Sequence, residues 1–336
     1  MTIKDIAKAC GVSVSTVSRV LNERPDVSEA VRRQVLDVVE RHNYIPNTSA
    51  RDLVRSQSDN LGVVVRGTGT PFFSDMLKTV TKEIDAAGYN MVLRQISSDD
   101  DEVKAGAILE REKKLRGLLF LGGRYDYTPA ELALVGVPYV CCSYTNQFGS
   151  LRKEDFASVS IDDHATAYRA VTTLIEHGHR RIAALVASCS DHSISQLRCN
   201  GYIQALEDHG IAVDDSLIIE SGGFDMERTY KATCALLDSG TDFTAIFAIS
   251  DVMAIAAIKA LADRGRCVPE DCSIIGIDGI ELSKYSLPTL TTMVQPVEQM
   301  ARESVHILVE LLRREGAPRH ILLDTTLREG GSIRQL

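Results

Sequence analysis

Several short apolar runs of the sequence are followed directly by polar side chains that could bind a small ligand. The polar residues in these positions are Ser143 after 139–142, Ser250 and Asp251 after 245–249, and Asp278 after 273–277. If the runs are parallel strands, their carboxyl ends meet at one edge of a sheet, which is where ligands bind in open α/β folds. Carboxylates and hydroxyls in such a place are suited to hydrogen bonding with a polyol.

The residue patterns of common enzyme sites are missing from the sequence. It contains no Gly-x-Ser-x-Gly, no His-Glu-x-x-His and no Gly-x-x-x-x-Gly-Lys. The segment 66–70 contains glycines but lacks the dinucleotide-binding spacing. Asp99–Asp101 is expected to begin a helix rather than to bind a metal. We therefore expect no enzyme, no cofactor and no metal site.

The elements that would position these side chains alternate along the chain beyond residue 60. Strand-length apolar runs occupy 61–65, 91–93, 117–121, 139–142, 159–161, 182–186, 245–249 and 273–277. Amphipathic segments of helical length lie between most of them, for example 73–87, 165–176 and 252–264. This alternation predicts parallel sheets with helices on both faces. Its length favours two doubly wound lobes over one sheet.

The first 45 residues instead predict three short helices. Thr2 and Asp5 can form a capping box, and Gly11 ends the first helix. Ser13 is expected to cap a second helix that runs to about residue 22, and Ser28 a third. A helix, a short turn with glycine and another helix is the layout of a helix-turn-helix, although any small helical bundle would show the same pattern.

Charge is distributed unequally along the chain. The net charge is −9, but residues 1–60 carry nine Lys and Arg against eight Asp and Glu, a net of +1. The remaining residues therefore carry −10. A near-neutral head with several arginines on an acidic body suits a DNA contact confined to one end.

Composition also predicts where the protein works. The apolar runs are too short to span a bilayer, and the first residues show no secretory leader, which favours a cytoplasmic protein without membrane contact. The eight cysteines form no Cys-x-x-Cys pair. We expect them to be small buried apolar residues in a reducing compartment.

Several segments, in order and at matching spacing, resemble the lac repressor/galactose repressor (LacI/GalR) family of transcriptional regulators. Residues 3–13 and 16–22 resemble the DNA-binding head of that family, and 44–47 with 50–53 resemble the junction that follows it. The resemblance continues through 71–73, 178–182, 268–271 and 290–292 and so covers essentially the whole chain. It implies an N-terminal all-α helix-turn-helix head and an α/β sensor of two doubly wound parallel-sheet lobes, similar to periplasmic binding proteins.

The resemblance also implies a division of the chain. The DNA-binding domain would cover 1–45, a hinge helix or linker 46–59, and the ligand-binding and dimerisation domain 60–336. Within the last, the N-lobe would comprise 60–161 and 291–322, and the C-lobe 162–290 and 323–336. The chain would cross between lobes near residues 161, 290 and 322.

The start of the second helix is the family's base-reading element. By resemblance, Val14, Ser15 and Arg19 take the base-reading positions, and an arginine can bind guanine through two hydrogen bonds. The alternative is that Arg19 is a solvated surface charge. The residues expected to bind phosphate and position the head are Ser13, Thr16, Asn22, Tyr44 and Asn47.

The segment after the head resembles the family's hinge, which folds on its operator. Leu53 matches the leucine that enters the minor groove, with Ala50, Arg51 and Arg55 around it. The alternative is a plain linker with one stray leucine. A hinge of this kind pairs with a second copy, so a homodimer on a near-palindromic operator is implied.

The implied effector site draws on both lobes: Phe72, Phe73, Ser143, Arg198, Phe224, Ser250, Asp251 and Asp278. Arg198 and Asp278 would bind hydroxyl pairs, and Phe73 or Phe224 would cover an apolar sugar face. Phe72 and Phe73 could equally be core residues. The sequence departs from the family at 66–67, where Arg-Gly replaces a common Pro-Asp; the added Arg66 suggests an anionic or phosphorylated ligand as an alternative to a neutral sugar.

Together these observations predict a ligand-responsive transcriptional regulator, most simply a repressor, whose operator affinity is controlled allosterically by a small sugar or sugar derivative. The alternative is a solute-binding receptor of the same fold with no role at DNA.

Overall fold

The computed structural model describes residues 2–21, 24–42, 58–67, 70–144 and 150–336. The chain divides into two compact units, Met1–Ser58 and Asp59–Leu336, here called the head and the sensor unit. Each unit is built around its own buried apolar side chains. Of the predicted hinge, 46–59, all but the last two residues lie outside the described residues.

The head consists of α1 (Ile3–Cys10), α2 (Val14–Leu21) and α3 (Glu29–Arg41). The predicted capping box of Thr2 and Asp5 is present, and Gly11 ends α1 in the left-handed conformation at φ 64°. Ser28 precedes α3 as expected, but its side chain makes no capping hydrogen bond. Apolar residues from all three helices are buried together: Ile6, Ala7, Cys10, Val17, Val20, Val35 and Val38.

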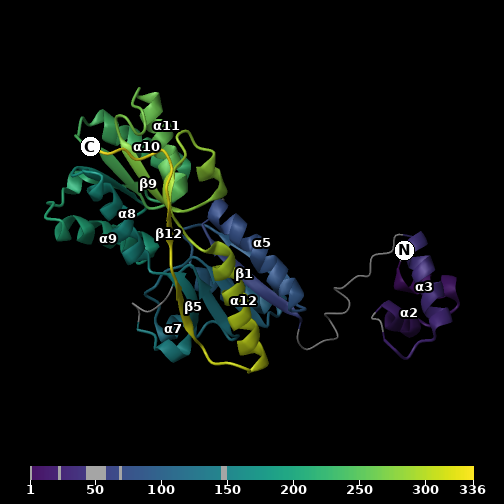
Figure 1. The fold of residues 1–336 in the computed structure, drawn as a ribbon. Helices are drawn as coiled ribbons and strands as arrows, with labels where there is room; N and C mark the ends of the chain where they lie inside the picture. Colours follow the sequence, from purple (N-terminus) through teal and green to yellow (C-terminus); the bar gives the residue numbers. More distant parts are fainter. Residues whose placement is uncertain (1, 22–23, 43–57, 68–69, 145–149) are drawn as a thin grey trace. The chain divides into compact units, whose positions relative to one another are not determined.

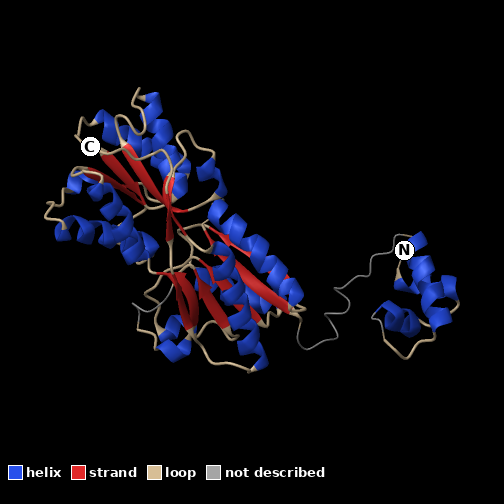
Figure 2. Ribbon diagram, viewed as in Figure 1, coloured by secondary structure: helices blue, strands red, loops and turns tan. Residues whose placement is uncertain are grey.

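The sensor unit contains two six-stranded sheets with helices packed on their faces (Figure 2). The first sheet has the order β11-β5-β4-β3-β1-β2, and all its neighbouring strands are parallel. Its strands are β1 (Asn60–Arg66), β2 (Asn90–Ile96), β3 (Gly117–Leu121), β4 (Tyr139–Cys142), β5 (Ala157–Ile161) and β11 (His320–Leu323). Its helices are α5 (Pro71–Ala86), α6 (Glu102–Lys113), α7 (Pro129–Leu132) and α12 (Val297–Arg313).

The second sheet has the order β12-β10-β9-β8-β6-β7 and is parallel except for β12, which runs antiparallel to β10. Its strands are β6 (Ile182–Val186), β7 (Ile218–Glu220), β8 (Ala245–Ala248), β9 (Ser273–Asp278), β10 (Thr291–Val294) and β12 (Thr326–Arg328). Its helices are α8 (Asp163–Glu176), α9 (Ile194–Asp208), α10 (Met226–Asp238) and α11 (Asp251–Asp263). We call each sheet with its helices the first and the second lobe.

Successive side chains of β1 point to opposite faces of the first sheet and pack against different helices. In β1, Val63 and Val65 belong to the cluster that includes α5 and α12, whereas Val64 belongs to the cluster around α6. Successive side chains of a strand point to opposite faces, so a run of apolar residues is what a strand buried on both faces requires. In Figure 1, α5 and α12 lie side by side.

The chain crosses between the lobes three times, but one crossing differs from the prediction. It passes from β5 to α8, from β10 to α12, and from β11 to β12. The second crossing was expected near residue 290, with 291–322 in the first lobe. Residues 291–294 instead form β10, which pairs with β9 of the second sheet. The Thr292 hydroxyl also donates to the buried carboxylate of Asp251, so the chain leaves the second lobe only after Val294.

The cysteines also depart from the prediction. Five of them, at 10, 141, 142, 234 and 272, are buried free thiols as expected. Cys267 is exposed, and Cys189 is joined to Cys199 by a disulfide. The prediction was therefore wrong for Cys267, which is exposed, and for Cys189 and Cys199, which are paired. These two come together because a loop between β6 and α9 folds back, which local sequence does not reveal.

No helix within the described part of the chain is long and apolar enough to span a membrane. Among the same residues, no three His, Cys, Asp or Glu side chains are grouped so that they could hold a metal ion.

Candidate effector cavity and DNA-reading head

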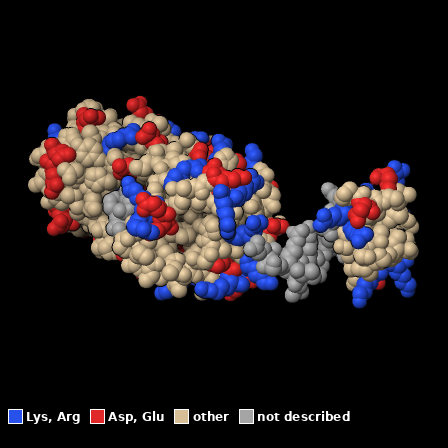
Figure 3. All heavy atoms as spheres, turned by 90° about the horizontal axis from the view of Figure 1, so that it is seen from below, with Lys and Arg blue, Asp and Glu red and all other residues tan. Residues whose placement is uncertain are grey.

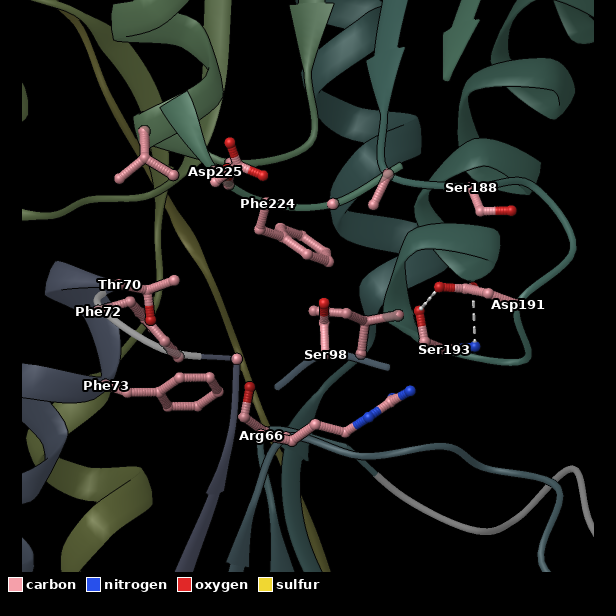
Figure 4. Close-up of a pocket in the computed structure, with 18 of the residues that line it drawn as sticks. Arg66, Thr70, Phe72, Phe73, Ser98, Ser188, Asp191, Ser193, Phe224 and Asp225 are labelled. Atoms are coloured by element: carbon pink, nitrogen blue, oxygen red, sulfur yellow. Dashed lines mark hydrogen bonds between the residues drawn. The ribbon is translucent and has the colours of Figure 1, made fainter. Parts of the chain in front are cut away.

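A cavity of about 500 Å³ lies between the two lobes of the sensor unit. Its walls come from segments that follow β1, β2, β3 and β4 in the first lobe, and β6, β7, β8 and β9 in the second. The cavity therefore lies at the carboxyl ends of both sheets, where the connections between parallel strands and helices meet. Figure 4 shows side chains entering it from both sides.

Seven of the eight predicted effector residues line this cavity: Phe72, Phe73, Ser143, Arg198, Phe224, Ser250 and Asp278. Asp251 does not. Its carboxylate is buried and accepts hydrogen bonds from the backbone N–H groups of Gly279 and Ile280 and from the Thr292 hydroxyl. Gly276 supports the same arrangement, because a Cβ there would collide with the Asp251 carboxylate. Asp251 thus ties α11 to β10 and to the segment after β9.

Arg198 is the central charged residue of the cavity. It projects from α9 with only 1% of its surface exposed. Its guanidinium donates to Asp163 Oδ1 at 2.8 Å and to the carbonyl oxygen of Ile249, and it lies 3.6 Å from Asp278 Oδ1. Buried charges of this kind are tolerated only when paired and hydrogen-bonded.

Gly201, three residues after Arg198, has a packing role in this structure. Gly201 lies in α9 where that helix passes α8, and a Cβ at this position would collide with the carbonyl oxygen of His164. The close approach of the two helices brings Asp163, at the start of α8, within hydrogen-bonding distance of Arg198. Sequence reasoning missed Asp163, although its place directly after β5 was a usable signal.

Asp278 has an unusual backbone conformation and a raised pKa. Its φ is 129°, a left-handed conformation that only strong local constraints maintain in a residue with a side chain. Burial raises the pKa of Asp278 to about 7, with Asp251 adding to the shift and Arg198 opposing it. The carboxylate accepts a hydrogen bond from Gln295 Nε2 at 2.8 Å.

Gln295 was not predicted, yet its other amide atom is open to a ligand. Gln295 Oε1 is buried and has no hydrogen-bond partner among the described residues, and the side chain lines the cavity. The Thr70 hydroxyl is in the same situation. Buried acceptors without partners are costly, so a ligand that brings hydroxyl donors to them would gain free energy.

Arg66 enters the cavity from the end of β1 (Figure 4). Its Nε lies 3.5 Å from Glu102 Oε2 and donates to the carbonyl oxygen of Asp100 at 3.2 Å. Glu102 is fully buried, and burial raises its pKa while Arg66 lowers it. Its Oε1 accepts the backbone N–H of Arg124 at 2.8 Å. The buried carboxyl group of Glu102 thus helps to hold the Arg66 side chain in place.

The aromatic residues divide between core and cavity. Phe72 is 7% exposed and packs in the main apolar cluster, where its ring meets that of Phe73 edge to face at 5.3 Å. Phe73 and Phe224 are half-buried, and their rings enter the cavity from opposite lobes (Figure 4). Such rings can cover the apolar C–H faces of a sugar.

In the head, the predicted base-reading residues share one exposed face. Val14, Ser15 and Arg19 are exposed on α2, opposite the buried Val17 and Val20. An amphipathic helix of this kind packs on α1 and α3 and leaves its other side to solvent. In Figure 3 both the head and the sensor unit show Lys and Arg together with Asp and Glu on the face that is drawn.

The hydrogen bonds of this face bear on individual roles. Ser13 Oγ accepts from the backbone N–H of Thr16 at 3.1 Å, and it shares further hydrogen bonds with the hydroxyls of Thr16 and Ser15. Arg19 lies 3.4 Å from Asp26 and is more than half exposed, so this pair leaves it free to exchange partners. The predicted DNA-contact residues Asn22, Tyr44, Asn47, Ala50, Arg51, Leu53 and Arg55 lie outside the described residues.

A helix-turn-helix head joined to a two-lobed sensor with a cavity between its lobes defines a class of ligand-sensing DNA-binding regulators. Comparison with known proteins agrees. Residues 2–47 match the model for bacterial regulatory proteins of the lacI family, and residues 171–333 match a periplasmic binding protein-like domain. The chain is 41% identical to the HTH-type transcriptional regulator MalR of Clostridium butyricum over 99% of both chains. It therefore belongs to the lacI family of transcriptional regulators.

Other relatives and solved structures extend this assignment. The HTH-type transcriptional repressor CytR of Escherichia coli is 33% identical and is matched over 97% of its length. The structure of the transcriptional regulator CelR in complex with cellobiose aligns with a TM-score of 0.72 at 30% identity, covering 99% of both chains. The lac repressor dimer bound to operator and the anti-inducer ONPF aligns with a TM-score of 0.80 at 25% identity and the same coverage.

Proposed function

We propose that this chain is a cytoplasmic, non-catalytic repressor that binds a near-palindromic operator as a homodimer and responds to a neutral sugar bound between its lobes. The observation that carries the proposal is the cavity itself, whose walls contain the hydrogen-bonding side chains of Arg198, Asp278 and Gln295 and two aromatic rings. Donors, acceptors and apolar faces in one enclosed site suit a polyol.

The charges of the cavity favour a neutral ligand over an anionic one. Its walls contain three arginines and four aspartates: Arg66, Arg198, Arg228, Asp99, Asp191, Asp225 and Asp278. Arg198 is already paired with buried carboxylates, and Glu102 lies against Arg66. A phosphate would therefore meet no net positive charge, whereas hydroxyls could use both signs. The solved relative with cellobiose is consistent with this class of ligand.

Dimerisation is supported by an exposed apolar surface next to η3 (Glu281–Lys284). Tyr285 is 76% and Leu287 is 91% exposed, with Leu282 beside them. Apolar side chains grouped in this way mark a surface that a partner covers. A second copy of the chain is the partner we propose, in line with the dimeric state of the lac repressor structure.

In the head we propose that Arg19, Ser15 and Val14 read base edges, that Ser13, Thr16, Asn22, Tyr44 and Asn47 bind phosphates, and that Leu53 with Ala50, Arg51 and Arg55 forms a minor-groove hinge. The exposure of Val14, Ser15 and Arg19 on one face of α2 supports the first of these roles. The ligand would act by favouring one arrangement of the lobes, and it can shift DNA affinity only by its differential affinity for the two arrangements.

The experiment that tests the proposal is selection of bound sequences from a random DNA pool by the purified protein. We expect enrichment of a near-palindrome. The affinity of the protein for this DNA is then measured in the presence of maltose, cellobiose or their phosphorylated forms. Release by a neutral sugar but not by its phosphate supports the proposal. Absence of enrichment even at low salt, where phosphate contacts are strongest, would contradict a DNA-binding role.

A matched pair of variants separates the two sites. Phe224→Ala should reduce sugar affinity while leaving operator affinity without sugar unchanged, because Phe224 is half-buried in the cavity wall of the sensor unit. Arg19→Ala should reduce operator affinity while leaving sugar affinity unchanged, since it lies in the separate head. Equal effects of both variants on both affinities would contradict the assignment.

A further inference from the structure

A disulfide connects α9 to the loop that precedes it beside the cavity. Cys189 follows β6 and Cys199 lies within α9, and their Cα atoms are 5.8 Å apart. We call residues 189–199 the bridged loop. Asp191, Ser193 and Arg198 line the cavity from this segment. The disulfide therefore closes a ring of backbone that supplies part of the cavity wall.

The bridged loop also joins the second lobe to the first. The backbone N–H of Tyr125, which lies after β3 in the first lobe, donates to the carbonyl oxygen of His192 at 2.9 Å. The Tyr125 hydroxyl donates to Gln196 Oε1 at 2.6 Å, and the same oxygen accepts the backbone N–H of His192 at 3.2 Å. The rings of Tyr125 and His192 meet edge to face at 6.0 Å. We call these interactions the lobe contact.

Hydrogen bonds that do not involve the disulfide hold the start of the bridged loop. Ser195 Oγ accepts the backbone N–H groups of Ala187 and Ser188, which fixes the start of the loop without any help from the disulfide. His192, at the tip, has a φ of 52°, a left-handed conformation that is unfavourable for a residue with a side chain. A tip in such a conformation needs constraints from its surroundings to persist.

The two sulfur atoms differ in access. Cys199 is fully buried, whereas Cys189 is half-buried beside the exposed Ser190. A thiol in solution can therefore reach the sulfur of Cys189 first. Disulfides in a reducing cytoplasm are mostly transient and often sense redox conditions, so a bridge at this place is expected to form and break.

We propose that the Cys189–Cys199 pair is a redox control of the lobe contact and of the cavity wall beside it. With the disulfide formed, the tip is held so that His192 binds Tyr125 and the lobes are kept together. In the dithiol form the tip relaxes and the lobe contact weakens. The proposal uses the proposed function only in placing the protein where thiols are kept reduced.

The chemical step is thiol–disulfide exchange with a low-molecular-weight disulfide. The Cys189 thiolate attacks the small disulfide, which forms a mixed disulfide and releases one small thiol. The Cys199 thiol then displaces the second small thiol and completes the protein disulfide. The protein loses two electrons and two protons, and the small disulfide gains them as two thiols.

Hydrogen exchange at the backbone amide of Tyr125 tests the proposal on the full-length protein. The protein is equilibrated with oxidised glutathione or with dithiothreitol, and the state of the pair is read by mass spectrometry of the 189–199 peptides. We expect the Tyr125 amide to exchange at least about ten-fold more slowly in the oxidised form, because opening of the lobe contact then costs more. The exchange measurement needs no sugar, so an error in the proposed effector would not affect it.

Two variants make the result specific. Cys189→Ser should show the fast exchange of the reduced protein under both conditions. Cys267→Ser, which removes an exposed free thiol elsewhere, should keep the full difference. Exchange at Tyr125 that is equal in oxidised and reduced wild-type protein would overturn the proposal, as would a pair that stays reduced in oxidised glutathione. The wild-type comparison stands even where Cys189→Ser fails to fold.

Discussion

Arg198→Met is the substitution that most directly tests how the cavity is held together. Methionine is long and apolar enough to occupy much of the space of the arginine, but it leaves two buried carboxylates without their cation. Removing one partner of a buried ion pair typically costs about 3–5 kcal/mol. Arg198 and Asp163 are both less than 5% exposed, so solvent cannot replace the lost partner. We therefore expect Arg198→Met to lower the free energy of unfolding by about 3–5 kcal/mol.

The loss should depend on pH in a defined direction. Burial raises the pKa of Asp163 and of Asp278, and Arg198 opposes both shifts. Without Arg198, both values rise further above those of the unfolded chain. A carboxyl group with a raised folded pKa contributes stability while it is protonated and loses it as pH rises through the folded pKa. The difference from wild type should therefore be larger at about pH 8 than at about pH 5.5.

Urea unfolding followed by circular dichroism measures this difference. Arg228→Met is the control, because Arg228 also lines the cavity but is about half exposed and pairs with an equally exposed Asp225. Its loss should cost no more than about 1 kcal/mol, as for surface ion pairs in general. If Arg198→Met costs as little as Arg228→Met at the higher pH, or if the loss grows as pH falls, the account of the buried pair is wrong.

Three further predictions concern the ligand, the DNA and the dimer. Sugar affinity should strengthen as pH rises from about 6 to about 8, because hydroxyl donors favour the ionised carboxylate of Asp278, whose pKa is about 7; calorimetry should show this dependence lost in Asp278→Asn. Arg19→Ala should weaken operator binding by about 1–3 kcal/mol and relax the preference at one base pair, as measured by fluorescence anisotropy on operator variants. Leu287→Asp should shift the protein towards monomer in sedimentation. The matched change Leu134→Asp, at an exposed leucine of the first lobe, should not.

Local signals were enough to predict the head and most of the parallel strands. The capping box at Thr2 and the left-handed turn at Gly11 follow from side chains within four residues of one another, so no tertiary information is needed. The long apolar strands such as β3 are also readable, because a strand buried on both faces must be apolar throughout. Short strands differ: β7 and β12 have three residues each with partly exposed side chains, and pairing alone defines them.

The same distinction applies to the cavity. Polar residues at strand ends were predictable because the carboxyl ends of parallel strands gather ligand-binding groups, and three of them, Ser143, Ser250 and Asp278, do line the cavity. Asp251 follows the same rule in sequence, yet it turns inward to bind the backbone after β9. Gln295 was missed because the crossing was placed near residue 290, four residues before β10 ends. Because the end of this strand was misplaced, Gln295 was not predicted as a cavity residue.

The arrangement of these groups explains how one ligand can influence both lobes. Asp278 and Gln295 belong to the end of the second sheet and to the crossing that leads into α12, and α12 packs against the first sheet. A ligand that hydrogen-bonds Gln295 Oε1 and also contacts Arg66 would engage both lobes, and its affinity must then depend on their separation. Coupling between sites commonly amounts to about 1–3 kcal/mol, which one or two such hydrogen bonds, made in only one arrangement, can supply. The unsatisfied oxygen of Gln295 is for this reason a more informative target than Arg198, whose loss would also break a buried ion pair. Gln295→Leu should reduce the sugar's effect on DNA binding while sparing the fold.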